Sequence, residues 1–180
     1  MTRLYHGSVS DFEEFKISEN LLKTRKENLQ EGLGIYFSTD ENFAKNYGNF
    51  TYIVDINEKD CWDFTSEDTF KYFIKRLSKV IDIDLDMYVP KNTILLATKG
   101  SISVVNFSKE INLLLDSCEY FYSTHGNFAE EIFETISNEY KKILCEKQFL
   151  KYYDNSFNAV IYLCIHDAEK IKITQKLKTN

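Results

Sequence analysis

The sequence has few residues that break secondary structure and no long apolar segment. One proline and six glycines occur in 180 residues, and 43% of the residues are hydrophobic. This composition is typical of a folded globular chain rather than a disordered or fibrous one. No apolar run approaches the ~20 residues that a membrane-spanning helix needs. The beginning, MTRLYHGS, lacks the apolar core of a secretory signal. We therefore expect a cytoplasmic protein with no membrane partner.

Excess positive charge is also missing. The formal net charge is −6 and the sequence pI is about 5.2, so a broad basic surface for nucleic acid is not expected. Two small basic clusters, KTRK at 23–26 and KK at 141–142, are typical of solvated loops or helix faces. Nucleic acid is therefore an unlikely partner on sequence grounds.

Paired cysteines and metal-binding patterns are absent as well. The four cysteines show no CxxC pair and no zinc-like spacing, which indicates reduced thiols in a cytoplasm; they are Cys61, Cys118, Cys145 and Cys164. His125 and His166 follow no ligand spacing and are interpreted as loop and turn residues. The sequence predicts no metal site.

What is present is a mixture of short strands and helices. Alternation or short apolar runs predict strands at 2–6, 35–37, 51–56, 158–165 and 170–173. Apolar residues at helical spacing predict helices at 66–80, 108–122 and 128–140. The segment 81–108 is ambiguous, with 102–107 either a short strand or the start of a buried helix. The order of these elements predicts an α+β fold.

The N-terminal part holds the most specific pattern. Four of the six glycines lie within the first 48 residues. The strand at 2–6 runs into His6-Gly7-Ser8, and a second segment reads GLGIYFSTD from Gly32 to Asp40. We expect a helix at 40–47 with Thr39 as its N-cap and Gly48 just beyond its end.

In this order the segments LYHGS, GLGIYFSTDENFAKNYG and FNAVIYLCIHDAEKIKI resemble the ADP-ribosyltransferase superfamily, in the branch shared by diphtheria toxin and the poly(ADP-ribose) polymerases. The resemblance covers residues 2–57 well and 157–173 loosely. It implies one domain over 1–180, with two small packed sheets flanked by helices. A mainly helical insertion at about 58–156 has no counterpart in the family.

The resemblance also implies an NAD pocket. His6 and Tyr36 match the family's catalytic His and Tyr, His6 bonding the ribose and Tyr36 stacking on the nicotinamide. Gly7 lacks a Cβ, so its backbone can approach the carboxamide. Ser38 or Tyr47 is expected at the other face of the nicotinamide or at its carboxamide. The full set expected to bind NAD is Tyr5, His6, Gly7, Ser8, Gly34, Tyr36, Phe37, Ser38 and Tyr47.

The third catalytic residue of the family, usually a Glu on a late strand, aligns at or near Tyr162. Tyr162 is therefore the third catalytic candidate. Other candidates for this role are Asn158, Asp154, Glu130 and Glu131, and the sequence leaves the choice open.

The implied activity is a mono-ADP-ribosyltransferase that moves ADP-ribose from NAD to a macromolecule, expected to be a protein, with release of nicotinamide. Related small proteins are toxins or phage effectors that act on a host factor, which would put the protein in a host cytoplasm. Two alternatives remain: a catalytically inactive NAD-binding or partner-docking module, such as an inhibitor of a host complex, and an NAD glycohydrolase.

Overall fold

The computed structural model describes residues 1–17 and 34–178, which fall into two compact units. Unit 1 comprises 1–62 together with 147–180, and unit 2 comprises 63–146. Gly32 and the KTRK cluster lie outside the described residues. Unit 2 is therefore inserted into the sequence of unit 1, with narrower bounds than the 58–156 expected from the sequence.

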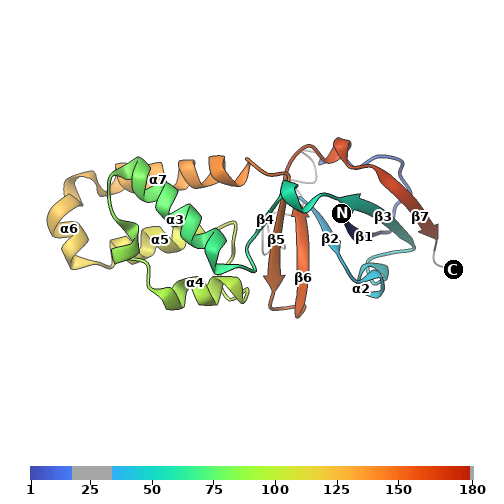
Figure 1. Ribbon diagram of the computed structural model, residues 1–180, viewed down its shortest axis with the longest axis horizontal. Helices are drawn as coiled ribbons and strands as arrows, with labels where there is room; N and C mark the ends of the chain where they lie inside the picture. The colour runs from blue at the N-terminus through green and yellow to red at the C-terminus, as the bar shows by residue number, and fades with distance from the viewer. Residues whose placement is uncertain (18–33, 179–180) are drawn as a thin grey trace. The chain divides into compact units, whose positions relative to one another are not determined.

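Unit 1 is built on one seven-stranded sheet (Figure 1) with the order β4-β5-β6-β2-β1-β3-β7. The strands are β1 (Thr2–Ser8), β2 (Ile35–Ser38), β3 (Phe50–Ile56), β4 (Cys61–Asp63), β5 (Phe149–Asp154), β6 (Ala159–Cys164) and β7 (Ile173–Lys178). The pairs β1–β2, β1–β3, β2–β6, β3–β7 and β5–β6 are antiparallel.

The chain is α+β, as expected, but the prediction of two small sheets is wrong. A single register pair, Tyr5 with Ser38, joins β1 to β2. That pair connects the strands on the β3 side to those on the β6 side, so the strands form one hydrogen-bonded sheet.

One face of the sheet carries the hydrophobic core of unit 1. Successive side chains of a strand point to opposite faces of the sheet. Leu4 of β1 and Phe37 of β2 point to the face that carries this core. The buried members of the cluster are Leu4, Phe15, Phe37, Tyr52, Val54, Ile56, Cys61, Phe149, Tyr162, Cys164, Ala168 and Ile171. Burial of this apolar area is the main force that stabilises the sheet.

The short helix α2 (Glu41–Lys45) packs against β1, β2 and β3. Its N-cap is Asp40 rather than the predicted Thr39. The Oδ1 atom of Asp40 accepts hydrogen bonds from the backbone nitrogens of Asn42 at 2.8 Å and Phe43 at 3.3 Å. The carboxylate also suits the positive end of the helix dipole.

The regular secondary structure of unit 2 is helical, apart from Asp63 at the end of β4. Its elements are α3 (Glu67–Ile81), η2 (Leu85–Met87), α4 (Lys91–Thr98), α5 (Phe107–Asp116), α6 (Glu119–His125), η3 (Gly126–Phe128) and α7 (Ala129–Leu144). Helix α7 packs against α3 and α5, around the rings of Phe70, Phe73, Phe107 and Tyr140. In the described part of the chain no helix has both the length and the apolar composition to cross a membrane.

Several boundaries differ from the sequence predictions. The predicted helix at 108–122 is two helices, α5 and α6, separated at Ser117–Cys118. In the ambiguous segment 102–107, residues 102–106 form a loop and α5 begins at Phe107. Strands β4 and β5 were not predicted, because each is short and mixes apolar with charged residues. The last strand lies at 173–178, since 168–170 forms the short helix η4. Unit 1 also contains η1 (Glu58–Asp60).

Candidate functional site

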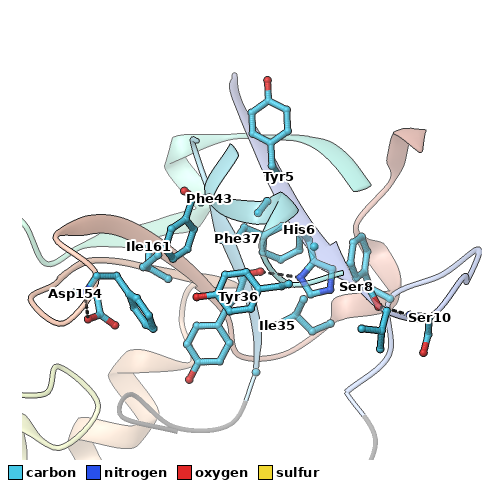
Figure 2. Close-up of a pocket in the computed structure, with 18 of the residues that line it drawn as sticks. Tyr5, His6, Ser8, Ser10, Ile35, Tyr36, Phe37, Phe43, Asp154 and Ile161 are labelled. Carbon is cyan, nitrogen blue, oxygen red and sulfur yellow. Dashed lines mark hydrogen bonds between the residues drawn. The ribbon is translucent and has the colours of Figure 1, made fainter. Parts of the chain in front are cut away.

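A cavity of about 860 Å³ opens in unit 1 where β1 and β2 part from one another (Figure 2). It is lined by β1 and the segment after it, by 34–38, by α2, and by the β5–β6 region. The volume lies in the range of about 300–1,000 Å³ that is usual for small-molecule and cofactor sites.

The cavity follows from the way the strands separate. β1 pairs with β3 along its whole length, from Thr2 opposite Ile56 to Ser8 opposite Phe50. Its described pairing with β2 consists of Tyr5 opposite Ser38. Residues of both strands beyond that pair line the cavity.

His6 bridges this gap. Its Nδ1 atom lies 2.8 Å from the backbone oxygen of Tyr36. A carbonyl oxygen can only accept, so Nδ1 carries the hydrogen; when the ring is neutral, Nε2 is then its acceptor nitrogen. The ring sits against Phe15 at 5.4 Å and Phe37 at 5.5 Å between centroids, so its orientation is fixed by packing as well as by the hydrogen bond.

Aromatic rings form much of the remaining wall. Tyr36, from β2, and Tyr47, just after α2, both line the cavity. Phe43 contacts Tyr47 at 5.3 Å and Phe157 at 5.5 Å between ring centroids. Burial, and then the nearby charge of Asp154, raise the pKa of Tyr47, so its phenol stays protonated at neutral pH.

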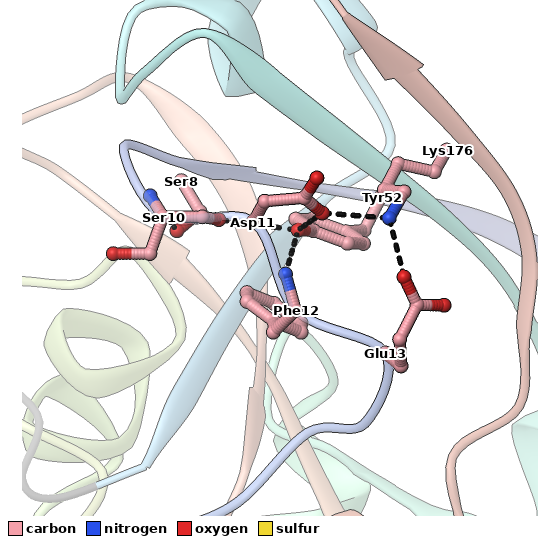
Figure 3. Close-up of polar contacts among 7 residues, drawn as sticks. All are labelled: Ser8, Ser10, Asp11, Phe12, Glu13, Tyr52 and Lys176. Atoms are coloured by element: carbon pink, nitrogen blue, oxygen red, sulfur yellow. Dashed lines mark hydrogen bonds and ion pairs between the residues drawn. The ribbon is translucent and has the colours of Figure 1, made fainter.

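The segment after β1 forms a further wall and is tied to β3 and β7 (Figure 3). The Tyr52 hydroxyl accepts from the Phe12 nitrogen at 2.8 Å and lies 3.1 Å from the Ser10 oxygen, to which it can donate. The Tyr52 and Phe12 rings stack at 3.9 Å. Lys176 from β7 donates to Asp11 at 2.6 Å and to Glu13 at 2.7 Å. These contacts hold the residues that face the cavity in place.

Two glycines at the site serve close packing of the protein itself. A Cβ on Gly7 would lie 1.8 Å from the backbone oxygen of Ala44, and one on Gly34 would lie 2.3 Å from that of Cys164. Glycine at position 7 therefore lets α2 approach β1, a reason that the sequence reading had not given. Both backbones still line the cavity.

All nine residues expected from the sequence to bind NAD line this cavity. They are Tyr5, His6, Gly7, Ser8, Gly34, Tyr36, Phe37, Ser38 and Tyr47. Two of them also shape the loops: Ser8 Oγ accepts from the Ser10 nitrogen at 3.1 Å and Ser38 Oγ from the Asp40 nitrogen at 3.0 Å.

Tyr162, the third catalytic candidate, is not brought to the cavity. It lies in the core cluster with an exposed fraction of 2%, opposite Phe37 on the core face. Its hydroxyl donates to Glu58 Oε1 at 2.9 Å. The neighbouring residue Ile161 faces the cavity instead, because successive side chains of a strand point to opposite faces.

The other candidates for the third catalytic residue lie at different places in the structure, and among them Asp154 lines the cavity. Glu130 and Glu131 are exposed in the first turn of α7 in unit 2. Asn158 is exposed in the β5–β6 turn with a φ of 52°, and its side chain accepts a hydrogen bond from the Tyr153 hydroxyl. Asp154 is buried and lines the cavity.

Sequence reasoning missed several residues of the cavity wall, including Phe12, Phe15, Tyr152 and Ile161. Phe12 and Phe15 follow β1 in a charged stretch with no periodicity. Tyr152 lies in the unpredicted strand β5. Its alternation with Asp154 in FLKYYD is the one signal that pointed to a shared face.

Among the described residues, no group of three His, Cys, Asp or Glu side chains is arranged to hold a metal ion. Cys61 and Cys164 are buried, Cys118 is partly buried and Cys145 is exposed, and none of these four described cysteines is in a disulfide. Burial raises the pKa of Cys164 to about 12, which makes it a poor nucleophile.

Comparisons with known proteins do not indicate a function for this cavity. No protein-family model and no curated protein matches the chain. A solved structure described as "Crystal structure of an anti-CRISPR protein" aligns over 98% of this chain and 95% of that chain, with 12% identity and a TM-score of 0.42. A similarity this distant carries no functional argument.

Proposed function

We propose that the protein is a mono-ADP-ribosyltransferase that uses NAD as its substrate. The observation that carries this proposal is the cavity at the β1–β2 separation, where His6 and Tyr36 meet. In the reaction the bond between the nicotinamide nitrogen and ribose C1′ breaks, and its electron pair leaves with nicotinamide. An acceptor group of the target then attacks C1′, and its proton is lost to a base.

The residues of the cavity suit the parts of NAD. With Nδ1 as donor to Tyr36, Nε2 of a neutral His6 ring has the chemistry to accept from a ribose hydroxyl. The rings of Tyr36 and Tyr47 offer flat faces for the nicotinamide. Ring stacking and the enclosing walls would hold the nicotinamide ribosyl bond in one orientation, which favours its cleavage.

The acceptor is proposed to be a side chain of a protein in a cytoplasm, either the cell's own or that of a host. One ADP-ribose unit is transferred, because the cavity lacks a Glu at the strand position where the resemblance expects one, at or near Tyr162. No metal takes part in the proposed reaction.

The test uses the purified full chain and NAD carrying a label on the adenine ribose, with and without cell lysate. Nicotinamide release that needs lysate, with label on one protein band, is the expected result. His6→Ala and Tyr36→Ala should abolish the labelling, whereas Lys91→Ala, at the start of α4 in unit 2, should not. No nicotinamide release by the wild type with any lysate would overturn the proposal.

An inactive binding or docking module is the second candidate, and one observation favours it. The strand position next to the expected catalytic Glu is filled by Ile161, an apolar residue, at the cavity. Such a module would bind NAD, or dock on a host complex, without releasing nicotinamide. Release without lysate would instead identify an NAD glycohydrolase, in which water is the acceptor.

A further inference from the structure

Asp154 is a buried carboxylate at the cavity, and it is one of the candidates that the sequence left open for the third catalytic residue. It ends β5 and has an exposed fraction of 7%. A carboxylate is rarely buried unless it is hydrogen-bonded or has a function. Its position therefore calls for an explanation.

The strand register places Asp154 on the same face of the sheet as Tyr152 and Ile161. Asp154 lies opposite Ala159, and Tyr152 lies opposite Ile161. Residues opposite one another in an antiparallel pair share a face, and residues two apart on a strand share it too. Asp154, Tyr152 and Ile161 thus belong to one face, and all three line the cavity. In the view of Figure 2 the Tyr36 ring lies between His6 and Asp154.

The β5–β6 turn holds this carboxylate in a fixed orientation. Its Oδ1 atom accepts from the backbone nitrogens of Ser156 at 2.9 Å and Phe157 at 3.3 Å. Two such bonds orient the side chain before any ligand arrives. Across the cavity wall, the charge of Asp154 acts on the phenol of Tyr47 and helps to raise its pKa.

Among the described lining residues, Glu14 is the second carboxylate, and it is more exposed than Asp154. Its side chain is 48% exposed and is paired with Lys16 at 3.0 Å. Water and the lysine both weaken its field at a reacting atom. Asp154 has the stronger field, because it is shielded from water.

We propose that Asp154 is the catalytic carboxylate of this site, standing on the strand next to the one where Ile161 lies. This rests on the proposed function. As the C1′–nitrogen bond breaks, positive charge develops on ribose C1′ and its ring oxygen, and Asp154 stabilises that charge. When the acceptor attacks C1′, its proton passes to Asp154 and then to water, so that nicotinamide, the ADP-ribosylated target and one proton are the products.

A purely structural alternative is that Asp154 only shapes the turn. Asp154→Asn separates the two roles, because the amide oxygen can still accept from Ser156 and Phe157 while the charge is lost. Asp154→Ser gives a second neutral variant with a turn-forming acceptor. Asp84→Asn is the matched control: Asp84 Oδ1 accepts from the Asp86 nitrogen at 3.2 Å in unit 2, and Asp84 is not among the residues that line the cavity.

The experiment measures three quantities on each full-length variant: nicotinamide release with lysate, the Kd for NAD, and Tm. We expect both neutral variants to lower the turnover rate by about 100-fold or more. The Kd should stay within about threefold and Tm within about 2 °C of wild type. Asp84→Asn should match wild type in all three measurements.

A folded neutral variant that keeps the rate within about threefold of wild type would overturn the role of Asp154 and leave the transferase proposal standing. A lower rate explained wholly by a weaker Kd or a lower Tm would also overturn it, in favour of the turn-forming role. A wild-type protein that binds NAD but releases no nicotinamide would overturn both proposals together.

Discussion

The Nδ1 atom of His6 lies 2.8 Å from the backbone oxygen of Tyr36, where the pairing between β1 and β2 has stopped. A side chain here makes the cross-strand hydrogen bond in place of the backbone. The strands can therefore separate without leaving this oxygen unsatisfied, and the separation is the site where a ligand can enter.

His6→Asn tests whether this bond and ligand binding are separate roles. The asparagine amide can donate to the Tyr36 oxygen, whereas His6→Ala leaves the oxygen without this donor. The alanine variant should lose about 1–2 kcal/mol of unfolding free energy, and the asparagine variant less. Both should weaken NAD binding about tenfold or more, because the ring is gone. Urea unfolding and calorimetric titration measure the two effects. Wild-type NAD affinity in His6→Asn would contradict a direct role for the imidazole.

Gly7→Ala should damage the site through packing. The new Cβ would meet the Ala44 oxygen at 1.8 Å, and backbone cannot yield there without moving α2. A loss of about 1–3 kcal/mol in urea unfolding is expected, together with weaker NAD binding because α2 leads to Tyr47. Gly126→Ala is the control: its nearest neighbour is the flexible Tyr122 side chain at 3.2 Å. A neutral Gly7→Ala would mean that α2 does not pack against β1 in this way.

The ion pairs of Lys176 with Asp11 and Glu13 should hold the segment that contains Phe12 in its position at the cavity wall. The hydrogen bond from Lys176 lowers the pKa of Asp11. Because the pKa of Asp11 is lowered in the folded state, its ion pair with Lys176 contributes fully to stability above the ordinary carboxyl pKa of about 3.8. That contribution is lost as the pH falls through the lowered pKa. The Phe12 amide resonance should therefore shift below about pH 4 in wild type. In Lys176→Met it should already be shifted at neutral pH, whereas in Lys172→Met it should behave as in wild type. An unshifted Phe12 resonance in Lys176→Met would show that the contact does not hold the wall.

Cys164 should make the fold sensitive to alkali. Burial raises its pKa from 9.0 to about 12. Between these values the thiol ionises in the unfolded chain but stays protonated in the folded one, so stability falls as the pH rises from about 9 toward 12. Comparing the urea midpoint of wild type and Cys164→Ala across this range isolates the effect from the tyrosines. Parallel pH profiles for the two proteins would contradict the raised pKa.

Much of the cavity could be predicted from the sequence, because many of the residues that line it lie in short segments within the first 48 residues. His6-Gly7-Ser8 and Gly34 to Ser38 lie at the ends or in the middle of short strands, and Tyr47 follows the next helix. Each local signal, such as a glycine beside an aromatic strand or a capped helix, is weak by itself, and the resemblance of their order to a known family grouped them. The cap itself was misplaced by one residue, since Thr39 and Asp40 both favour N-caps and the backbone decides between them.

The part of the site formed by β5 and β6 could not be predicted in this way. Which of Ile161 and Tyr162 faces the cavity depends on strand register, and a shift of one residue reverses every side chain. Asp154 ends a strand whose sequence, FLKYYD, gave no strand prediction. Its cavity position exists only because β5 pairs with β6 and β6 with β2.

The sequence by itself determined that the chain is α+β, that a helical segment interrupts the strands, and that His6, Tyr36 and Tyr47 are functional candidates. The first two properties depend on local composition and periodicity, whereas the three candidate residues come from the resemblance of LYHGS and GLGIYFSTDENFAKNYG to a known family. Tertiary structure alone decided that the strands form one sheet joined by the Tyr5–Ser38 pair, that Tyr162 packs in the core, and that Asp154 reaches the cavity. These depend on pairings between residues far apart in the chain, which no local pattern encodes.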